Sequence, residues 1–354
     1  MPGLRKLLSI DGGGVRGLAA IVVLEQLMEV ANAERSNKGL SPQEPWQMFD
    51  MIGGTSTGGL IAIMLGRLRM SLDECKTAYT ELSGMAFTKR NILERVSGKP
   101  SLGAKFKSKS LDNAILGILE AKKDFLGASS SDALMKDEQK DCYVFVVSHL
   151  ENISGTLAIL RSYRNLTHPV KQFHTMKLWQ ACRATSAATT FFDPVDVNGS
   201  RYSDGALIYN NPVQLVHNEA GEMFPGEPTL IISLGTGIAA YKEFSPNVLN
   251  IGVQLAEIAT QTDRDADAFF RQDGGKMHHL QRYFRFDIPG IGDISLDEAD
   301  QLDMIKHASE KYMEIGETTV KMGMCSQQLS SGEPTLPEVP DESELQVRLD
   351  RLRS

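Results

Sequence analysis

The 354-residue sequence predicts an α/β fold, a three-layer sandwich in which helices cover both faces of a mostly parallel central sheet. Short β-like segments alternate with helical segments along the chain, as is typical of such folds. One segment, "TLIISLGTG" at 229–237, has the apolar run of a strand buried inside a sheet. Hydrophobic residues make up 42% of the chain, which is enough for a large core.

The predicted elements begin with a strand at 4–10, then a glycine-rich turn, then a helix at 18–36 whose apolar residues recur every three or four positions. A second strand at 48–54 leads into a buried helix at 60–68. A strand end and a turn are expected within 201–212. Further strands are expected at 142–150, 156–163, 229–237 and 281–288, and further helices at 71–83, 176–188, roughly 247–272 and 299–322.

Composition excludes several classes of protein. The net charge of -8 argues against a nucleic-acid partner held by bulk charge. The four cysteines lie far apart without a CxxC pair, so we expect reduced thiols, no zinc site and no cofactor. The first residues lack the apolar run of a signal peptide, and no apolar run approaches the roughly 20 residues that span a bilayer. We therefore expect a cytoplasmic protein whose membrane contact is peripheral.

The domain organisation follows from a shift in composition near residue 326. From there the chain is polar and rich in proline, which is typical of a tail or linker. The sequence thus predicts one domain over 1–325 and a tail over 326–354. A boundary of this kind is compatible with further domains after the tail.

Ser56 lies in a motif that can present a nucleophile. Gly54-Thr55-Ser56-Thr57-Gly58 matches G-x-S-x-G, a sharp strand-to-helix turn that exposes a serine hydroxyl at the carboxyl end of a sheet. Gly54 and Gly58 allow the backbones to pass closely. The position between a predicted strand and an apolar helix favours this interpretation over the alternative, a glycine-rich turn with a surface serine.

A glycine-rich loop at 12–17 follows the first predicted strand and opens a helix. It fits G-x-G-x-x-G, which suggests a dinucleotide-binding loop. That function would need an acidic residue about 20 positions later at the end of the next strand, where the sequence has Gly53-Gly54 instead. Adjacent N–H groups in a glycine turn can also form an oxyanion hole. The predicted donors are the N–H groups of Gly13, Gly14 and Thr57.

A serine nucleophile needs a base, and none of the histidines lies in a convincing turn at a strand end. They are His149, His168, His174, His217, His278, His279 and His307. Asp204, in "YSDGAL", precedes Gly205 in a tight turn that could aim its carboxylate inward. A carboxylate with an ordinary pKa of about 3.9 is a poor base, so Asp204 would need desolvation and contact with Ser56. The alternative for this Asp-Gly pair is a simple turn.

Together these motifs resemble the patatin-like phospholipase family. The matching strings, in this order, are "DGGGVRG" at 11–17, "GTSTG" at 54–58, "ACRATSAATTFF" at 181–192, "DGA" at 204–206, "NNP" at 210–212 and "SLGTG" at 233–237. The resemblance extends over roughly residues 4–320. It implies a patatin-like fold and a calcium-independent lipid acyl hydrolase that uses no metal and acts on phospholipid or other acyl-lipid substrates at a peripheral membrane surface.

The resemblance also implies roles for individual residues. Ser56 and Asp204 would form a Ser–Asp catalytic dyad, with Asp204 as base. The loop residues Gly12, Gly13 and Gly14, with Thr57, would form the oxyanion hole. Arg16 and Gly17 would support this loop, and Arg16 could instead meet a lipid phosphate; Gly54, Gly58 and Gly205 are the motif glycines. One departure from the family is Thr189, where proline is frequent, which affects the shape of a loop near the base.

A basic segment at 86–123 carries nine Lys or Arg residues and three acids. It could be a solvated surface or could contact anionic lipid headgroups. Two functions remain as alternatives to hydrolysis, namely a lipid acyltransferase that uses the same dyad and a lipid-binding interaction module.

Overall fold

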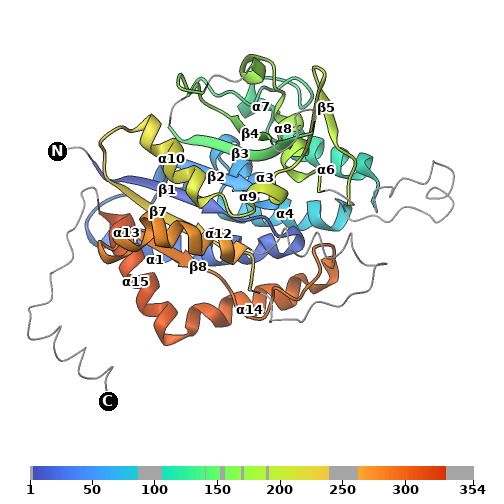
Figure 1. Cartoon of the computed structure of the whole chain (residues 1–354). Helices are drawn as coiled ribbons and strands as arrows, with labels where there is room; N and C mark the ends of the chain where they lie inside the picture. Colours follow the sequence, from blue (N-terminus) through green and yellow to red (C-terminus); the bar gives the residue numbers. More distant parts are fainter. Residues whose placement is uncertain are drawn as a thin grey trace, which may run out of the picture.

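In the part of the chain that the computed structural model describes, eight strands form one sheet in the order β5-β6-β3-β2-β1-β7-β8, with β4 paired to β3 (Figure 1). The described residues are 3–86, 106–139, 141–151, 156–168, 171–188, 191–238 and 262–331. The strands are β1 (Arg5–Ile10), β2 (Met51–Thr55), β3 (Tyr143–Leu150), β4 (Thr156–Arg161), β5 (Val195–Val197), β6 (Ser200–Asp204), β7 (Thr229–Leu234) and β8 (Tyr283–Phe286).

The central strands are parallel, and the antiparallel pairs gather at one side of the sheet. β3, β2, β1, β7 and β8 run in the same direction, whereas β4, β5 and β6 enter through antiparallel pairs. The carboxyl ends of the parallel strands therefore meet at one edge, where loops can place functional side chains together. The prediction of a mostly parallel sheet is confirmed.

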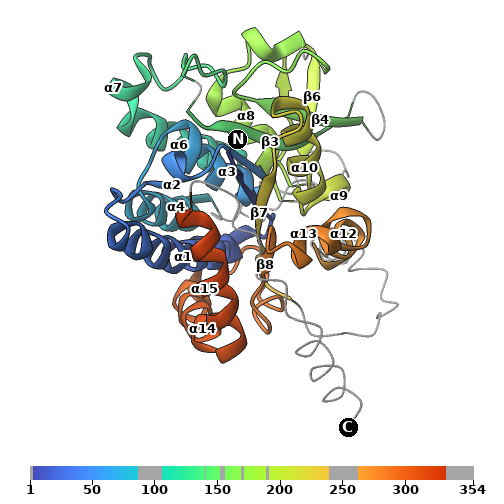
Figure 2. The ribbon, with the colours of Figure 1, turned by 90° about the vertical axis from the view of Figure 1, so that its left-hand side faces the viewer.

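Helices cover both faces of this sheet (Figure 2). They are α1 (Gly17–Asn37), α2 (Pro45–Met48), α3 (Thr57–Ala62), α4 (Leu72–Ala86), α6 (Ser108–Ala121), α7 (Lys123–Leu126), α8 (Leu178–Ser186), α9 (Ala206–Tyr209), α10 (Val213–Met223), α12 (Thr262–Phe269), α13 (Gly275–His279), α14 (Leu302–Glu314) and α15 (Gly316–Ser330). Helices α1, α4, α14 and α15 lie on one side of the sheet, and α10, α12 and α13 lie on the other. This arrangement is the predicted three-layer sandwich.

The alternation of side chains along each strand divides the core into two parts. Leu8 packs with the helices of the α1 face, whereas its neighbour Leu7 packs with Val216 of α10 on the opposite face. Both leucines are fully buried. Strands that are buried on both faces explain the near-continuous apolar runs in β1 and β7.

The largest differences from the predicted elements are two helix boundaries. The helix expected at 299–322 is divided between α14 and α15, because Ile315 adopts extended backbone with φ -64° and ψ 129°. Helix α15 then continues to Ser330, so residues 326–330, predicted to open the tail, belong to this helix and pack against α1. Leu329 is fully buried there.

Other predictions fall partly or wholly outside the described residues. The helix expected at 247–272 is described only from Thr262, where α12 begins. Thr189, half of the basic segment (residues 87–105) and the tail beyond residue 331 also lie outside the described residues. Among the residues that the structure describes, no helix is long and apolar enough to cross a membrane. All four cysteines are buried free thiols.

Candidate active site

The pairing of three strands brings Ser56 and Asp204 together. β2 and β6 occupy the same edge of β3, and their carboxyl ends meet head to head: Thr55 lies opposite Val147, and Asp204 lies opposite the next residue, Ser148. β4 pairs with the opposite edge of β3 over residues 145–150, which include the point where the ends of β2 and β6 meet. The residue that follows β2 is Ser56, and it therefore lies next to the end of β6.

Ser56 is held in an unusual backbone conformation at the start of α3. Its φ of 54° and ψ of -126° lie outside the regions that non-glycine residues prefer. The turn requires the two motif glycines, because a Cβ at Gly54 would lie 2.1 Å from the Gly58 carbonyl oxygen. The N–H of Ser56 donates to the hydroxyl of Thr185 over 2.9 Å. These contacts fix the direction of the Ser56 side chain, as a nucleophile elbow does.

The Asp204 carboxylate accepts a hydrogen bond from the Ser56 hydroxyl, with 2.6 Å between Oγ and Oδ2. Its other oxygen, Oδ1, accepts the N–H of Ala206 over 2.9 Å. Asp204 is only 2% exposed, and this burial raises its pKa from 3.8 to about 7, although the bond from Ser56 opposes the shift. Desolvation and contact with Ser56 are the two conditions that Asp204 needs to act as a base, and both are present.

The glycine loop between β1 and α1 passes directly beside Ser56. The N–H of Gly12 donates to the Asn210 carbonyl over 3.0 Å, so this N–H group already has a partner within the protein. A Cβ at Gly12 would lie 3.0 Å from the Ser56 Cβ. The N–H of Gly13 points to the Thr57 hydroxyl over 3.1 Å, while Gly14 lines the same cavity as Ser56. We call residues 11–17 the oxyanion loop, after the role that the sequence predicts for them.

Arg16 is buried and supports the oxyanion loop through hydrogen bonds. It is 3% exposed, and its guanidinium donates to the carbonyls of Gly13 over 3.3 Å and Gly292 over 2.5 Å. Burial lowers its pKa from the usual value. Of the two roles considered for Arg16, these contacts are those of loop support. Gly17 allows a close approach, because a Cβ there would lie 2.4 Å from the Tyr79 hydroxyl oxygen.

A mainly apolar cavity opens beside Ser56, between the oxyanion loop, α4 and α6. Its apolar lining includes Leu60, Leu82, Leu111, Phe191, Phe192 and Leu296. Phe191 and Phe192 end one of the matching strings, but the sequence does not mark any of these side chains as part of a cavity, because their positions follow helical or loop patterns that ordinary core residues share. The described cavity is small, and its apolar walls lie beside the serine, where they could contact the apolar part of an ester.

The histidines make no hydrogen bond to the Ser56–Asp204 pair, and the described residues hold no cluster that could bind a metal ion. All seven histidines belong to the described residues, and none of them hydrogen bonds to Ser56 or Asp204. His149 instead lies 3.2 Å from the hydroxyl of Ser203. Among the residues that the structure describes, no group of three His, Cys, Asp or Glu side chains is arranged to hold a metal ion.

The described part of the basic segment shows local ion pairs. Lys122 pairs with Glu74 over 2.7 Å, and Lys123 pairs with Glu120 over 2.9 Å. Both are pairs at the protein surface of the kind that contribute little to stability. The five basic residues that the segment carries between 87 and 105 lie outside the described residues.

Comparison with known proteins yields a family match over most of the motifs. Residues 8–217 match the model of a family described as patatin-like phospholipase. Human calcium-independent phospholipase A2-gamma is 31% identical over 95% of this chain and 41% of its own length. Phospholipase A I from Arabidopsis thaliana is 28% identical over 86% of this chain and 26% of its own. The chain thus spans less than half the length of these relatives.

Among solved structures, the crystal structure of VipD from Legionella pneumophila aligns with a TM-score of 0.40 and 11% sequence identity. The alignment covers 87% of this chain and 67% of that one.

Proposed function

The chain belongs to the patatin-like phospholipase family, and from this premise we propose that it is a serine acyl hydrolase that cleaves fatty-acyl esters of phospholipids or related lipids. The observation that carries the proposal is the hydrogen bond of 2.6 Å between the Ser56 hydroxyl and the buried Asp204 carboxylate. A serine that contacts a base directly, in an elbow beside a glycine loop, is the arrangement that covalent acyl transfer needs.

In the proposed reaction the Ser56 Oγ attacks the ester carbonyl carbon while its proton passes to Asp204 Oδ2. The carbonyl oxygen becomes an oxyanion and accepts the N–H groups of Gly13, Gly14 and Thr57, with the substrate oxygen replacing the Thr57 hydroxyl at Gly13. Asp204 then returns the proton to the leaving alcohol, and an acyl-enzyme remains. Water attacks this ester with Asp204 again as base, which releases the fatty acid and restores Ser56.

The environment of Asp204 supports its role as base. A carboxylate of ordinary pKa is mostly too weak to take a proton from a serine at neutral pH. Burial raises the pKa of Asp204 to about 7, close to the pH at which a general base is most effective. The groups that face it are neutral donors, the Ser56 hydroxyl and the Ala206 N–H, rather than a cation.

The cavity and the family support the proposed class of substrate. The apolar side chains of α4 and α6 suit an acyl chain, and the homologous enzymes carry phospholipase in their names. Contact with anionic headgroups through the basic segment remains part of the proposal, at about 1 kcal/mol per basic residue near such a surface. Vesicle binding that does not weaken with salt or with removal of anionic lipid would contradict that contact.

The test of the function is hydrolysis of a panel of defined phospholipids, galactolipids and neutral lipids, with Ser56→Ala as the matched variant. We expect fatty-acid release and fluorophosphonate labelling by the wild type, and neither by Ser56→Ala, while circular dichroism shows both proteins folded. Release at a similar rate by Ser56→Ala would rule out this nucleophile. Added glycerol and lysolipid test the alternative, because an acyltransferase would give acylated acceptor in place of free fatty acid.

A further inference from the structure

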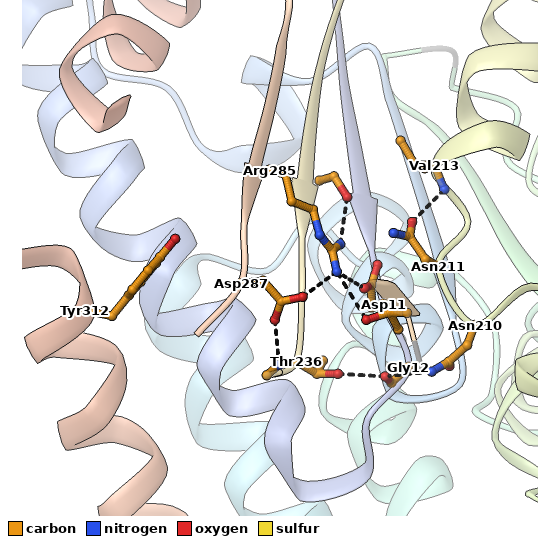
Figure 3. A network of polar contacts seen from close by, with 12 residues as sticks. Asp11, Gly12, Asn210, Asn211, Val213, Thr236, Arg285, Asp287 and Tyr312 are labelled. Atoms are coloured by element: carbon orange, nitrogen blue, oxygen red, sulfur yellow. Dashed lines mark hydrogen bonds and ion pairs between the residues drawn. The ribbon is translucent and has the colours of Figure 1, made fainter. Parts of the chain in front are cut away.

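A buried charged cluster adjoins the oxyanion loop on the face of the sheet that carries α10 (Figure 3). It consists of Asp11, Arg285 and Asp287, and we call it the Arg285 cluster. Asp11 is fully buried, and the side chains of Arg285 and Asp287 are 16% and 6% exposed. A cation and two carboxylates in this setting are costly to bury, so their arrangement calls for a reason beyond packing.

The register of three parallel strands builds the cluster. Ser9 of β1, Ser233 of β7 and Arg285 of β8 form one row across the sheet. The next row on the same face lies just beyond the strand ends and holds Asp11 and Asp287, with Gly235 between them. A Cβ at Gly235 would lie 2.1 Å from the Asp287 carboxyl carbon, so only glycine leaves room for that carboxylate.

Arg285 is the centre of the contacts in this cluster. Its Nη2 atom lies 2.7 Å from Asp11 Oδ2 and 2.5 Å from Asp287 Oδ2. Its Nη1 donates to the Ser233 hydroxyl over 2.9 Å, and its Nη2 also reaches Thr262 over 3.2 Å. Removal of this cation would leave two carboxylates buried near one another without the guanidinium that pairs with both, which is strongly unfavourable.

The cluster connects to the oxyanion loop at two points. Asp11 is the first residue of that loop and immediately precedes Gly12. Asp287 Oδ1 accepts the N–H of Gly237 over 2.8 Å, which holds the turn that follows β7. From that turn the Thr236 hydroxyl donates to the Gly12 carbonyl over 2.7 Å, as Figure 3 shows.

The bond from Thr236 has a direct consequence for the oxyanion hole. The Gly12 carbonyl and the Gly13 N–H belong to the same planar peptide unit and point in opposite directions. A donor that fixes the carbonyl on one side therefore fixes the direction of the Gly13 N–H on the other, toward the Thr57 hydroxyl. A Cβ at Gly13 would lie 2.2 Å from the Thr236 hydroxyl oxygen, so the two segments are in close contact.

We propose that Arg285 is a positioning residue for the reaction: it neutralises Asp11 and Asp287 and so holds the turn at 235–237 where Thr236 orients the Gly12–Gly13 peptide. The inference rests on the proposed function, because an oxyanion donor matters only if an oxyanion forms. Arg285, Asp287 and Thr236 all lie outside residues 8–217 that match the family model. Their role comes from their contacts alone.

The experiment compares Arg285→Met, which keeps length but removes the charge, with Arg285→Lys, which keeps the charge. The matched control is Arg161→Met, which breaks the buried pair of Arg161 with Glu219 between β4 and α10 and touches no residue of the site. Each variant is assayed on a water-soluble acyl ester for kcat, KM and the single-turnover rate of acylation, below its unfolding midpoint.

Misplaced catalytic groups cost rates on the order of 100-fold, so we expect Arg285→Met to lower kcat and acylation by roughly 10- to 100-fold with KM nearly unchanged. Arg285→Lys should recover part of that loss. Arg161→Met should lose stability but keep its acylation rate. Thr236→Val tests the last contact without a buried charge, and it should lower acylation several-fold, which keeps the test valid if Arg285→Met does not fold.

The outcomes separate this inference from the proposed function. If the wild type hydrolyses no acyl ester, the proposed function fails. If the wild type is active and Thr236→Val and a folded Arg285→Met retain its acylation rate, only the positioning role is overturned. A loss of acylation in Arg161→Met equal to that in Arg285→Met would also overturn it, because the effect would then follow general destabilisation.

Discussion

Replacement of Asp204 by asparagine should abolish hydrolysis and, at the same time, stabilise the protein at alkaline pH. Asparagine keeps the shape of the side chain and an oxygen that can accept the Ala206 N–H. It cannot ionise, and it is no base. The two consequences share one cause, namely that the folded protein surrounds Asp204 with too little solvent to favour its charge.

The magnitude follows from the raised pKa. The folded state binds the Asp204 proton up to about pH 7, whereas the unfolded chain releases it near 3.8. The wild type therefore loses stability as the pH rises through this window, because the folded state holds more protons than the unfolded state. At 1.36 kcal/mol per pKa unit, the loss amounts to about 4 kcal/mol by pH 8.

The assay is urea unfolding of the wild type and Asp204→Asn at about pH 4 and pH 8, with extrapolation of the unfolding free energy to water. We expect similar stabilities at the lower pH and a variant more stable by about 4 kcal/mol at the higher pH. Other titrating groups, Asp11 among them, are common to both proteins and cancel in the difference. Asp303→Asn, an exposed change on α14, controls for the loss of a carboxylate.

A stability difference that stays constant between the two pH values would refute the raised pKa of Asp204. Ester hydrolysis by Asp204→Asn near the wild-type rate would refute its role as base. The two results are independent, so the stability measurement can reject the raised pKa of Asp204 and the hydrolysis measurement can reject its role as base.

Three further predictions concern the same site. The kcat/KM of the wild type should fall about tenfold per pH unit below about pH 7, because protonated Asp204 cannot accept the Ser56 proton, and a pH–rate profile checks this. Gly12→Ala should lower kcat at least tenfold, because the added methyl would lie 2.2 Å from the Asn210 side-chain oxygen. The control is Gly84→Ala, which should remain active because Gly84 is a helical glycine with open space around it. Leu82→Trp should fill the cavity and reduce kcat/KM for a palmitoyl ester relative to a butyryl ester by roughly tenfold, since each buried methylene contributes about 0.8 kcal/mol.

Local sequence signals predicted most of the sheet. β1, β7 and β8 lie within apolar runs bounded by glycine or polar residues, and the elbow at Ser56 has a spacing that few other turns require. The break between α14 and α15 was missed because the helical pattern continues through it. Gly316, the first residue of α15, was the available signal, since glycine in a helix interior is unfavourable.

A second miss had a recognisable signature. The segment before β2 was predicted as strand from its apolar residues Met48 and Phe49, but Pro45–Met48 forms the short helix α2. Pro45 occupies the first helical position, and the N–H of Glu44 donates to the Gln47 side chain over 2.9 Å. Proline and a capping residue at these spacings are a start signal for a helix, and the short apolar run outweighed it.

What the sequence could not give is the register that joins distant segments. Ser56 and Asp204 are 148 positions apart, and their contact depends on β6 continuing along the edge of β3 that β2 leaves free. β6 is short and flanked by turns, so the pattern of apolar residues along it does not predict this pairing. Arg285 is similar, because a lone arginine between two phenylalanines gives no indication that its partner is Asp11, at the other end of the chain.

The two buried carboxylates of the site show how the fold separates two tasks. Burial raises the pKa of both Asp11 and Asp204 to about 7, although Asp11 pairs with Arg285 while Asp204 makes no ion pair among the described residues. An arginine beside Asp204 would lower its pKa and remove the basicity that the reaction needs. Arg285 instead pairs with Asp11 at the start of the oxyanion loop, whereas the hydrogen bonds that Asp204 accepts within the described residues come from the Ser56 hydroxyl and the Ala206 N–H. Because a cation favours the charged form of a carboxylate, an arginine against Asp204 itself would make this base weaker than burial alone leaves it.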